Sequence, residues 1–288
     1  MAVTEKRRGR VLVVTLDRPE ARNAFDGATI TALREVFEAV ARQPEPSLDP
    51  AGGAVADDGI GDAAERPHVV LLQATGPVFC AGADLGEMKR LGQADVEENL
   101  TAAREMGAMF RAIRLCPAPV VARVQGPAFG GGVGMVCACD LVVASDTARF
   151  AFSEVRLGLV PGVIAPLVME RIGTAPARYH FLTGEPFSSL EALRIGLVDR
   201  LVAPDELDAT VNELVQTLLK GGPATLGRVK RLVEGTLARG FEQSLEFTAG
   251  EIADARTAAE AQAALNAFFA KEPAAWARKT SWPPEGDT

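Results

Sequence analysis

Short apolar runs rich in β-branched residues recur along the first half of the chain and constrain its fold more than any other feature. Each has the length of a strand, and turn signals such as Thr75-Gly76-Pro77 follow them. The four runs are Val11–Leu16, Val69–Ala74, Pro119–Val124 and Leu141–Ala144. Helix-like segments separate these runs. Apolar strands that alternate with helices predict an α/β domain.

The segments between the strands carry helix start signals followed by a helical apolar period. Asp26 can cap a helix whose apolar residues recur every three or four positions from Ile30 to Val40. Asp95 and Glu98 form a capping pair for a second, longer helix. The sequence therefore predicts two helices with an apolar face between the strands.

The remainder of the chain divides into two further kinds of segment. From about Pro204 onward the pattern is purely helical, so we expect a core over residues 1–203 and a helical C-terminal region over 204–288. Residues 43–67 are dominated by Pro, Gly, Ala and Asp and lose the apolar periodicity. This stretch is interpreted as a surface insertion and is expected to be mobile.

Charge and hydropathy exclude several classes of partner. The 288 residues include 30 Lys and Arg against 38 Asp and Glu, a net charge of −8, which disfavours nucleic acid as a ligand. No run reaches the roughly 18 apolar residues that a membrane span needs. The N-terminal sequence lacks the apolar core of a signal peptide, so a cytoplasmic location without membrane attachment is expected. A small anion needs only a few local cations and stays possible.

The cysteine and histidine residues provide few candidates for metal binding or nucleophilic catalysis. Cys80, Cys116, Cys137 and Cys139 lie in apolar surroundings without the spacing of metal ligands, and buried reduced thiols are expected. Only two histidines are present, and they are far apart in the sequence. No metal site is therefore expected, and a Ser-His-Asp triad has almost no candidates.

Two glycine-rich turns are the strongest candidates for a ligand site. Phe79–Leu85 follows a strand directly, and Gly126–Gly134 lies between a strand and an apolar helix. Small residues let a ligand approach the backbone, and N–H groups at a helix start can receive an anion. The second turn is neither a Walker loop nor a dinucleotide fingerprint, because Met135 stands at the third glycine position. Close backbone packing explains each turn alone equally well.

Taken in order, the two turns and four other motifs resemble the crotonase superfamily, which includes the enoyl-CoA hydratases and isomerases. The matching segments extend over nearly the full chain. They are Leu16–Ala24, Phe79–Leu85, Gly126–Gly134, Cys139–Leu141 with Phe152–Glu154, Gly158–Gly162 and Phe268–Lys271. The resemblance implies a spiral of β-β-α units with a helical C-terminal trimerisation region, assembled as a homotrimer or a dimer of trimers.

The resemblance also implies an acyl-CoA substrate and a role for each turn. By motif position, the N–H groups of Ala83 and Gly131 form an oxyanion hole for a thioester enolate, and Glu154 is the catalytic carboxylate. CoA enters as part of the substrate, so no separate cofactor is expected. The implied substrate and CoA contacts are Arg22, Ala24, Ala81, Asp84, Leu85, Gly134 and Lys271. Arg22 and Lys271 could equally be ordinary solvated charges.

Gly134 is the departure that leaves the reaction open. Hydratases of this family typically carry a second glutamate at this position, three residues after the oxyanion glycine, and glycine cannot transfer a proton. A single Glu154 suits a 3,2-enoyl-CoA isomerase. However, segments such as Phe152–Gly184 look most like hydratases of the 3-methylglutaconyl-CoA type, so hydration of the 2,3 double bond is favoured.

Functions of other classes are also considered. A non-catalytic acyl-CoA-binding homologue would tolerate the loss of a glutamate, but it has no need for Glu154. RNA binding, found in some relatives, is disfavoured by the net charge. Thioester hydrolysis or decarboxylation would use the same oxyanion hole.

Overall fold

A six-stranded sheet forms the centre of the computed structural model, which describes residues 2–46, 65–277 and 282–283. The strand order is β1-β2-β3-β4-β6-β9. The strands are β1 (Val3–Arg8), β2 (Val11–Leu16), β3 (Val69–Ala74), β4 (Val120–Val124), β6 (Leu141–Ser145) and β9 (Arg200–Val202). Only β1 is antiparallel to its neighbour, and all the other pairs are parallel.

The central strands are apolar on both faces because both faces are covered. β2 and β3 pair in register from Val11 opposite Val69 to Leu16 opposite Ala74. Alternate side chains of these strands enter two separate apolar clusters, one on each side of the sheet. This double burial is typical of parallel sheets and explains why the runs are continuous rather than alternating.

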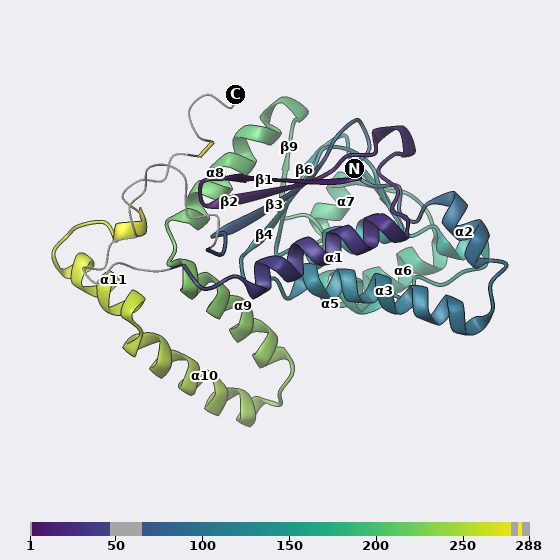
Figure 1. The fold of residues 1–288 in the computed structure, drawn as a ribbon. Coiled ribbons are helices and arrows are strands. Elements are labelled where there is room, and N and C mark those ends of the chain that lie inside the picture. The colour runs from purple at the N-terminus through teal and green to yellow at the C-terminus, as the bar shows by residue number, and fades with distance from the viewer. Residues whose placement is uncertain (1, 47–64, 278–281, 284–288) are drawn as a thin grey trace.

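Helices α1 and α3 cover one face of the sheet with their apolar sides (Figure 1). Both begin at the predicted caps, since the side chain of Asp26 accepts from Thr29 N and that of Asp95 accepts from Glu98 N. The helices up to residue 194 are α1 (Gly27–Arg42), α2 (Leu85–Leu91), α3 (Val96–Arg114), α4 (Gly131–Ala138), α5 (Ala165–Ile172), α6 (Thr174–Thr183) and α7 (Ser189–Arg194).

A small second sheet lies beside the two glycine-rich turns. It consists of β5 (Ala128–Phe129), β7 (Arg149–Ala151) and β8 (Phe187–Ser188), in the order β5-β7-β8. An isolated bridge between Cys80 and Ala128 joins the first turn to β5. The small sheet therefore brings together segments from three parts of the sequence.

The C-terminal helices have two different relations to the core. α8 (Leu207–Leu219) packs on the second face of the large sheet, where its buried side chains join the smaller apolar cluster. α9 (Pro223–Leu237), α10 (Phe241–Thr257) and α11 (Ala259–Phe269) extend away from the sheet (Figure 1). These three helices leave large apolar side chains exposed, including Phe241, Leu245 and Ile252.

Most of the predicted elements are confirmed, with a few differences. The four predicted strands and the helical pattern after Pro204 are present, and the four cysteines are free and buried. Strands β1 and β9 and the short strands of the second sheet were not predicted. Of the proposed insertion at 43–67, residues 47–64 lie outside the described residues. Its flanks are joined by a 3.1 Å hydrogen bond from Arg66 N to Pro44 O. No helix in the described ranges is long and apolar enough to cross a membrane.

Candidate active site

The two glycine-rich turns lie directly against each other. Phe79 N donates to Pro127 O at 3.0 Å, and Phe129 N donates to Cys80 O at 2.9 Å. The contact is so close that a Cβ built on Gly82 would stand 2.8 Å from the Phe129 carbonyl oxygen. Gly82 also has a φ of +89°, a conformation that glycine adopts readily. Glycine at this position therefore lets the two backbones meet.

Two backbone N–H groups are left unpaired where the turns meet. Phe25 N donates to Gly82 O and Asp84 N donates to Phe25 O, whereas Ala83 N has no acceptor among the described residues. The N–H of Gly131, the first residue of α4, likewise has no acceptor in the described part of the chain. A helix start carries partial positive charge, so an anion beside Gly131 is stabilised.

Glu154 brings a partly buried carboxyl group to the same place. It begins a short 3-10 helix at Glu154–Leu157, and its Oε1 would lie 3.0 Å from a Cβ built on Gly130. Gly130 has a φ of +49°, so both its conformation and this close approach require glycine. Oε2 of Glu154 is buried without a hydrogen-bond partner among the described residues. Burial raises the pKa of this carboxyl, and a hydrogen bond to its own backbone only partly offsets the effect.

A cavity of about 330 Å³ joins these groups. Ala83, Gly131 and Glu154 all line it, together with Ala81 and Leu85. The rest of its lining is mainly apolar and comes from α2, α3 and the 157–164 segment. The cavity therefore places two unpaired N–H donors and one carboxyl group around a mainly apolar space.

Gly134 lies one turn further along α4 and does not line this cavity. A Cβ built on Gly134 would stand 2.2 Å from Cγ2 of Ile164 and 3.2 Å from Cζ of Phe110. Ile164, which does line the cavity, therefore fills the volume into which a side chain at position 134 would extend. Gly134, one of the expected substrate contacts, is buried behind Ile164.

The remaining predicted substrate contacts near the first turn are Ala24, Asp84 and Leu85, and each has a different position. Asp84 caps α2, because its carboxylate accepts from Gly86 N at 2.8 Å. Ala24 is buried, and its carbonyl oxygen accepts from Arg18 Nη1 at 3.1 Å. Leu85 is 81% exposed and stands at the edge of the cavity.

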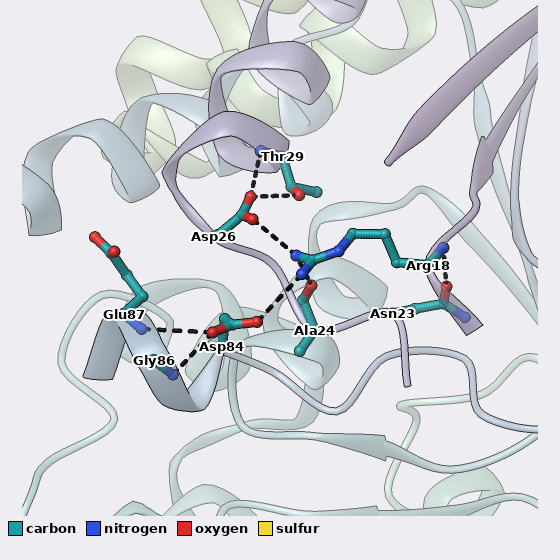
Figure 2. A network of polar contacts seen from close by, with 8 residues as sticks. All are labelled: Arg18, Asn23, Ala24, Asp26, Thr29, Asp84, Gly86 and Glu87. Carbon is teal, nitrogen blue, oxygen red and sulfur yellow. Dashed lines mark hydrogen bonds and ion pairs between the residues drawn. The ribbon is translucent and has the colours of Figure 1, made fainter. Parts of the chain in front are cut away.

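Arg18 organises this region, and the sequence analysis gave it no role. Its guanidinium contacts Asp26 at 2.9 Å and Asp84 at 3.4 Å, so that one side chain links the caps of α1 and α2 (Figure 2). Burial raises the pKa of Asp26, but hydrogen bonds from Thr29 and the charge of Arg18 leave it lowered overall. Because Asp84 directly follows Ala83, this network positions one of the two free N–H groups.

Arg22 and Lys271, the two predicted cations, lie in different places. Arg22 is exposed in a left-handed conformation next to the first turn, where its carbonyl oxygen accepts from Ala81 N at 3.0 Å. Lys271 follows α11, which lies on the opposite side of the molecule from α2 (Figure 1). A single chain therefore does not bring Lys271 to the cavity.

Two N–H donors that converge beside a partly buried carboxyl group are suited to one class of chemistry. The donors can hold a negative charge that develops on a carbonyl oxygen, and the carboxyl can move a proton to or from a neighbouring carbon. This is the arrangement of an enzyme that passes through an enolate.

Comparison with known proteins places the chain in a family. Residues 62–279 match the family described as enoyl-CoA hydratase/isomerase. A crystal structure of an enoyl-CoA hydratase from Shewanella pealeana superimposes with a TM-score of 0.84 at 32% identity, covering 96% of both chains. The short-chain-enoyl-CoA hydratase of Clostridium acetobutylicum is 30% identical over 92% of this chain and 94% of its own.

The chain therefore belongs to the enoyl-CoA hydratase/isomerase family and has the crotonase fold. A partial match is the mitochondrial methylglutaconyl-CoA hydratase 1 of Pyricularia oryzae, 35% identical over 70% of this chain and 60% of its own. The resemblance to the crotonase superfamily in the sequence analysis is confirmed.

Proposed function

We propose that the protein hydrates the 2,3 double bond of a 2-enoyl-CoA thioester. The observation that carries this proposal is the convergence of the unpaired N–H groups of Ala83 and Gly131 with the Glu154 carboxyl in one cavity. Water adds to C3 while the double-bond electrons move toward the thioester oxygen. The two N–H groups stabilise the resulting enolate.

Glu154 serves both proton transfers in this scheme. As a carboxylate it takes a proton from the attacking water, and as a carboxylic acid it returns a proton to C2 when the enolate collapses. A raised pKa suits a group that must do both near neutral pH. Because one carboxyl reaches both carbons, hydroxyl and hydrogen add to the same face of the double bond.

Isomerisation of a 3-enoyl-CoA is the second candidate, and the packing at Gly134 favours it. Ile164 fills the space beside Gly134, so no second carboxylate enters the cavity from α4. A lone Glu154 would remove a proton from C2 and return it to C4, with the same enolate between the two steps.

The anionic part of CoA would lie outside the cavity. Arg22 is exposed beside the first turn and is the proposed contact for its phosphates. Lys271 would contribute only from a neighbouring subunit, which agrees with the proposed homotrimer or dimer of trimers.

The decisive experiment follows the ultraviolet absorbance of conjugated enoyl thioesters. Purified protein is added to crotonyl-CoA, 3-methylglutaconyl-CoA and 3-hexenoyl-CoA, and products are identified by mass. We expect loss of absorbance with a gain of one water from a conjugated substrate. Glu154→Gln should lower this rate by about 10²–10⁴-fold.

Other outcomes of the same experiment would reject the proposal. A gain of absorbance from 3-hexenoyl-CoA at unchanged mass, without hydration of the other two, would assign the isomerase. Equal turnover by the wild-type enzyme and Glu154→Gln would remove Glu154 from the mechanism.

A further inference from the structure

Aromatic rings pack against the chain just before Glu154. Phe152, two positions earlier, is 1% exposed. The centroid of its ring lies 4.9 Å from that of Phe181, which it meets edge-on, and 6.0 Å from that of Phe187. Both of these rings belong to residues 180–187, which join the end of α6 to the start of β8. The position of Phe152 therefore depends on how this segment is held.

The same segment also contacts the chain just after Glu154. A Cβ built on Gly184 would stand 2.8 Å from Cγ1 of Val155 and 3.2 Å from Cγ of Arg156. Residues 180–187 thus pack against the neighbours of Glu154 on both sides. A shift of the segment would move the carboxyl group relative to the two N–H donors, and proton transfer tolerates little displacement of this kind.

His180 fixes the conformation of the segment. Its imidazole ring stacks on Phe187, with the ring centroids 4.1 Å apart and the planes inclined by 29°. Its carbonyl oxygen accepts a hydrogen bond from Gly184 N at 3.0 Å. His180 is 4% exposed and does not line the active-site cavity. It therefore acts on Glu154 only through the packed rings and the turn.

A separate cavity of about 620 Å³ lies beside His180 and holds the charged groups that face it. Tyr179 of α6, Glu185 of the following turn, and Glu191 and Arg194 of α7 line this cavity. Nδ1 of His180 is buried without a hydrogen-bond partner in the described part of the chain, and Nε2 lies 3.9 Å from Oε1 of Glu191. Arg194 donates to both oxygens of Glu191 at 2.6 Å. The carboxylate nearest to the imidazole is therefore already paired.

These surroundings favour the uncharged form of the imidazole. Burial lowers the pKa of His180, and the charge of Arg194 adds to this effect while that of Glu191 opposes it. Protonation would place a positive charge in a buried aromatic stack, at a cost in desolvation. The ring that stacks on Phe187 is therefore the neutral one.

We propose that His180 is a positioning residue for Glu154: its neutral ring keeps residues 180–187 packed around the catalytic carboxyl, and protonation of the ring loosens this packing. The inference rests on the proposed function in one respect, that Glu154 transfers the proton. That role is the same in hydration and in isomerisation. Turnover should then respond to the titration of a group that does not touch the substrate.

The first test separates turnover from substrate binding. His180→Ala should lower kcat at pH 8 by about 10–100-fold. Its affinity for butyryl-CoA, a saturated thioester that undergoes neither reaction, should equal that of the wild type by calorimetry. His180→Phe keeps an aromatic ring on Phe187 and should restore kcat. A folded His180→Ala variant with the wild-type kcat would overturn the inference.

Tyr179→Ala is the matched control for this test. Tyr179 adjoins His180 and lines the same cavity, but it is 59% exposed and its ring does not pack on Phe187 or Phe152. Its loss should leave kcat unchanged, and an equal loss of kcat in both alanine variants would overturn the specific role of His180. Thermal melting checks that each variant is folded.

The second test is the pH profile of kcat. Glu154 titrates in the wild type and in His180→Phe alike, so its contribution cancels in the ratio of the two rates. The ratio of wild type to variant should be constant above about pH 7 and should fall as the pH decreases through the lowered pKa of His180. A constant ratio down to about pH 5 would overturn the role of protonation.

The third test does not depend on any reaction. The contribution of neutral His180 to the free energy of unfolding is fully present above its ordinary pKa of about 6.5 and is lost as the pH falls through the lowered folded value. The free energy of unfolding of His180→Phe minus that of the wild type should therefore increase as the pH falls across this window. A constant difference in urea titrations would overturn the inference. Absence of turnover with every thioester would instead reject the proposed function and leave this result standing.

Discussion

Gly134 and Ile164 share one volume beside the active-site cavity. The Cγ2 atom of Ile164 stands 2.2 Å from the place that a Cβ on Gly134 would occupy. The glycine on α4 and the branched residue at the end of the 158–164 segment are thus complementary in space. The missing glutamate is replaced by packed hydrocarbon and not by an empty pocket.

This complementarity predicts coupled effects on stability. Gly134→Ala should overpack the site and lower the free energy of unfolding by about 1–3 kcal/mol. Ile164→Ala should cost about 2–5 kcal/mol because it leaves a cavity. The double variant should cost less than the sum by at least about 0.5 kcal/mol, measured by urea unfolding. Additive costs would show that the two residues do not compete for the same space.

Glu154 predicts a pH dependence of stability with a definite sign. Its pKa is raised in the folded state, so the neutral carboxyl is favoured by folding and the charged form is not. Its contribution to the free energy of unfolding is fully present at pH values below its ordinary pKa of about 4.3. This contribution is lost as the pH rises through the raised pKa that the carboxyl has in the folded state. Glu154→Gln removes this titration. The difference in free energy of unfolding, variant minus wild type, should therefore increase with pH across this window in denaturant titrations. A constant difference would contradict burial of the charge.

The N–H of Gly131 can be tested with a matched pair of substitutions. A Cβ at this position would stand 2.4 Å from Cζ of Phe25, so Gly131→Ala introduces a clash but keeps the N–H. Gly131→Pro introduces a similar clash and removes the donor. We expect the proline variant to be slower than the alanine variant by about 10²–10³-fold in kcat. Thermal melts of both variants control for folding, and equal rates would show that this N–H does not stabilise the enolate.

Arg18 should affect both stability and turnover. Arg18→Met removes the link between the caps of α1 and α2 and should lower the free energy of unfolding by about 1–2 kcal/mol, since the guanidinium is partly solvated. It should also lower kcat/KM, because Asp84 adjoins Ala83. Arg200→Met is the control, as it breaks a surface pair with Glu213 that is far more exposed. A loss of stability without any change in kcat/KM would confine Arg18 to a structural role.

The exposed apolar side chains of α9, α10 and α11 predict an oligomer. Apolar surface of this extent is usually covered by another subunit. We expect light scattering to give three or six times the chain mass of 30.3 kDa. Leu245→Glu on α10 should shift the protein toward monomer while the far-ultraviolet circular dichroism is unchanged. A wild-type monomer at micromolar concentration would contradict the predicted assembly.

The strands that were not predicted lack a clear apolar pattern, for two physical reasons. β1 pairs only with β2 and buries little more than Val3, so its polar sequence gives no apolar signal. β5 and β8 have two residues each and β7 and β9 have three, too few to show a period of two. The buried central strands were predictable because both of their faces are apolar.

The parts of the candidate site that follow local sequence motifs could be predicted, and the parts that depend on contacts between distant residues could not. The two glycine-rich turns and Glu154 follow a local pattern, and the structure brings them to one cavity. The contact of Gly134 with Ile164 joins residues thirty positions apart, and no local pattern encodes it. Arg18 belongs to a turn motif in the sequence, and its two carboxylate partners become apparent only when the folded chain brings the first residues of α1 and α2 together.

The hydrogen bond from Arg66 N to Pro44 O has a practical consequence for work with this protein. It holds the end of α1 and the approach to β3 together independently of what connects them. Connections whose ends are held close together tolerate replacement and insertion. The connection between Pro44 and Arg66 is therefore suited to carry an affinity handle, a fluorescent reporter or a surface tether.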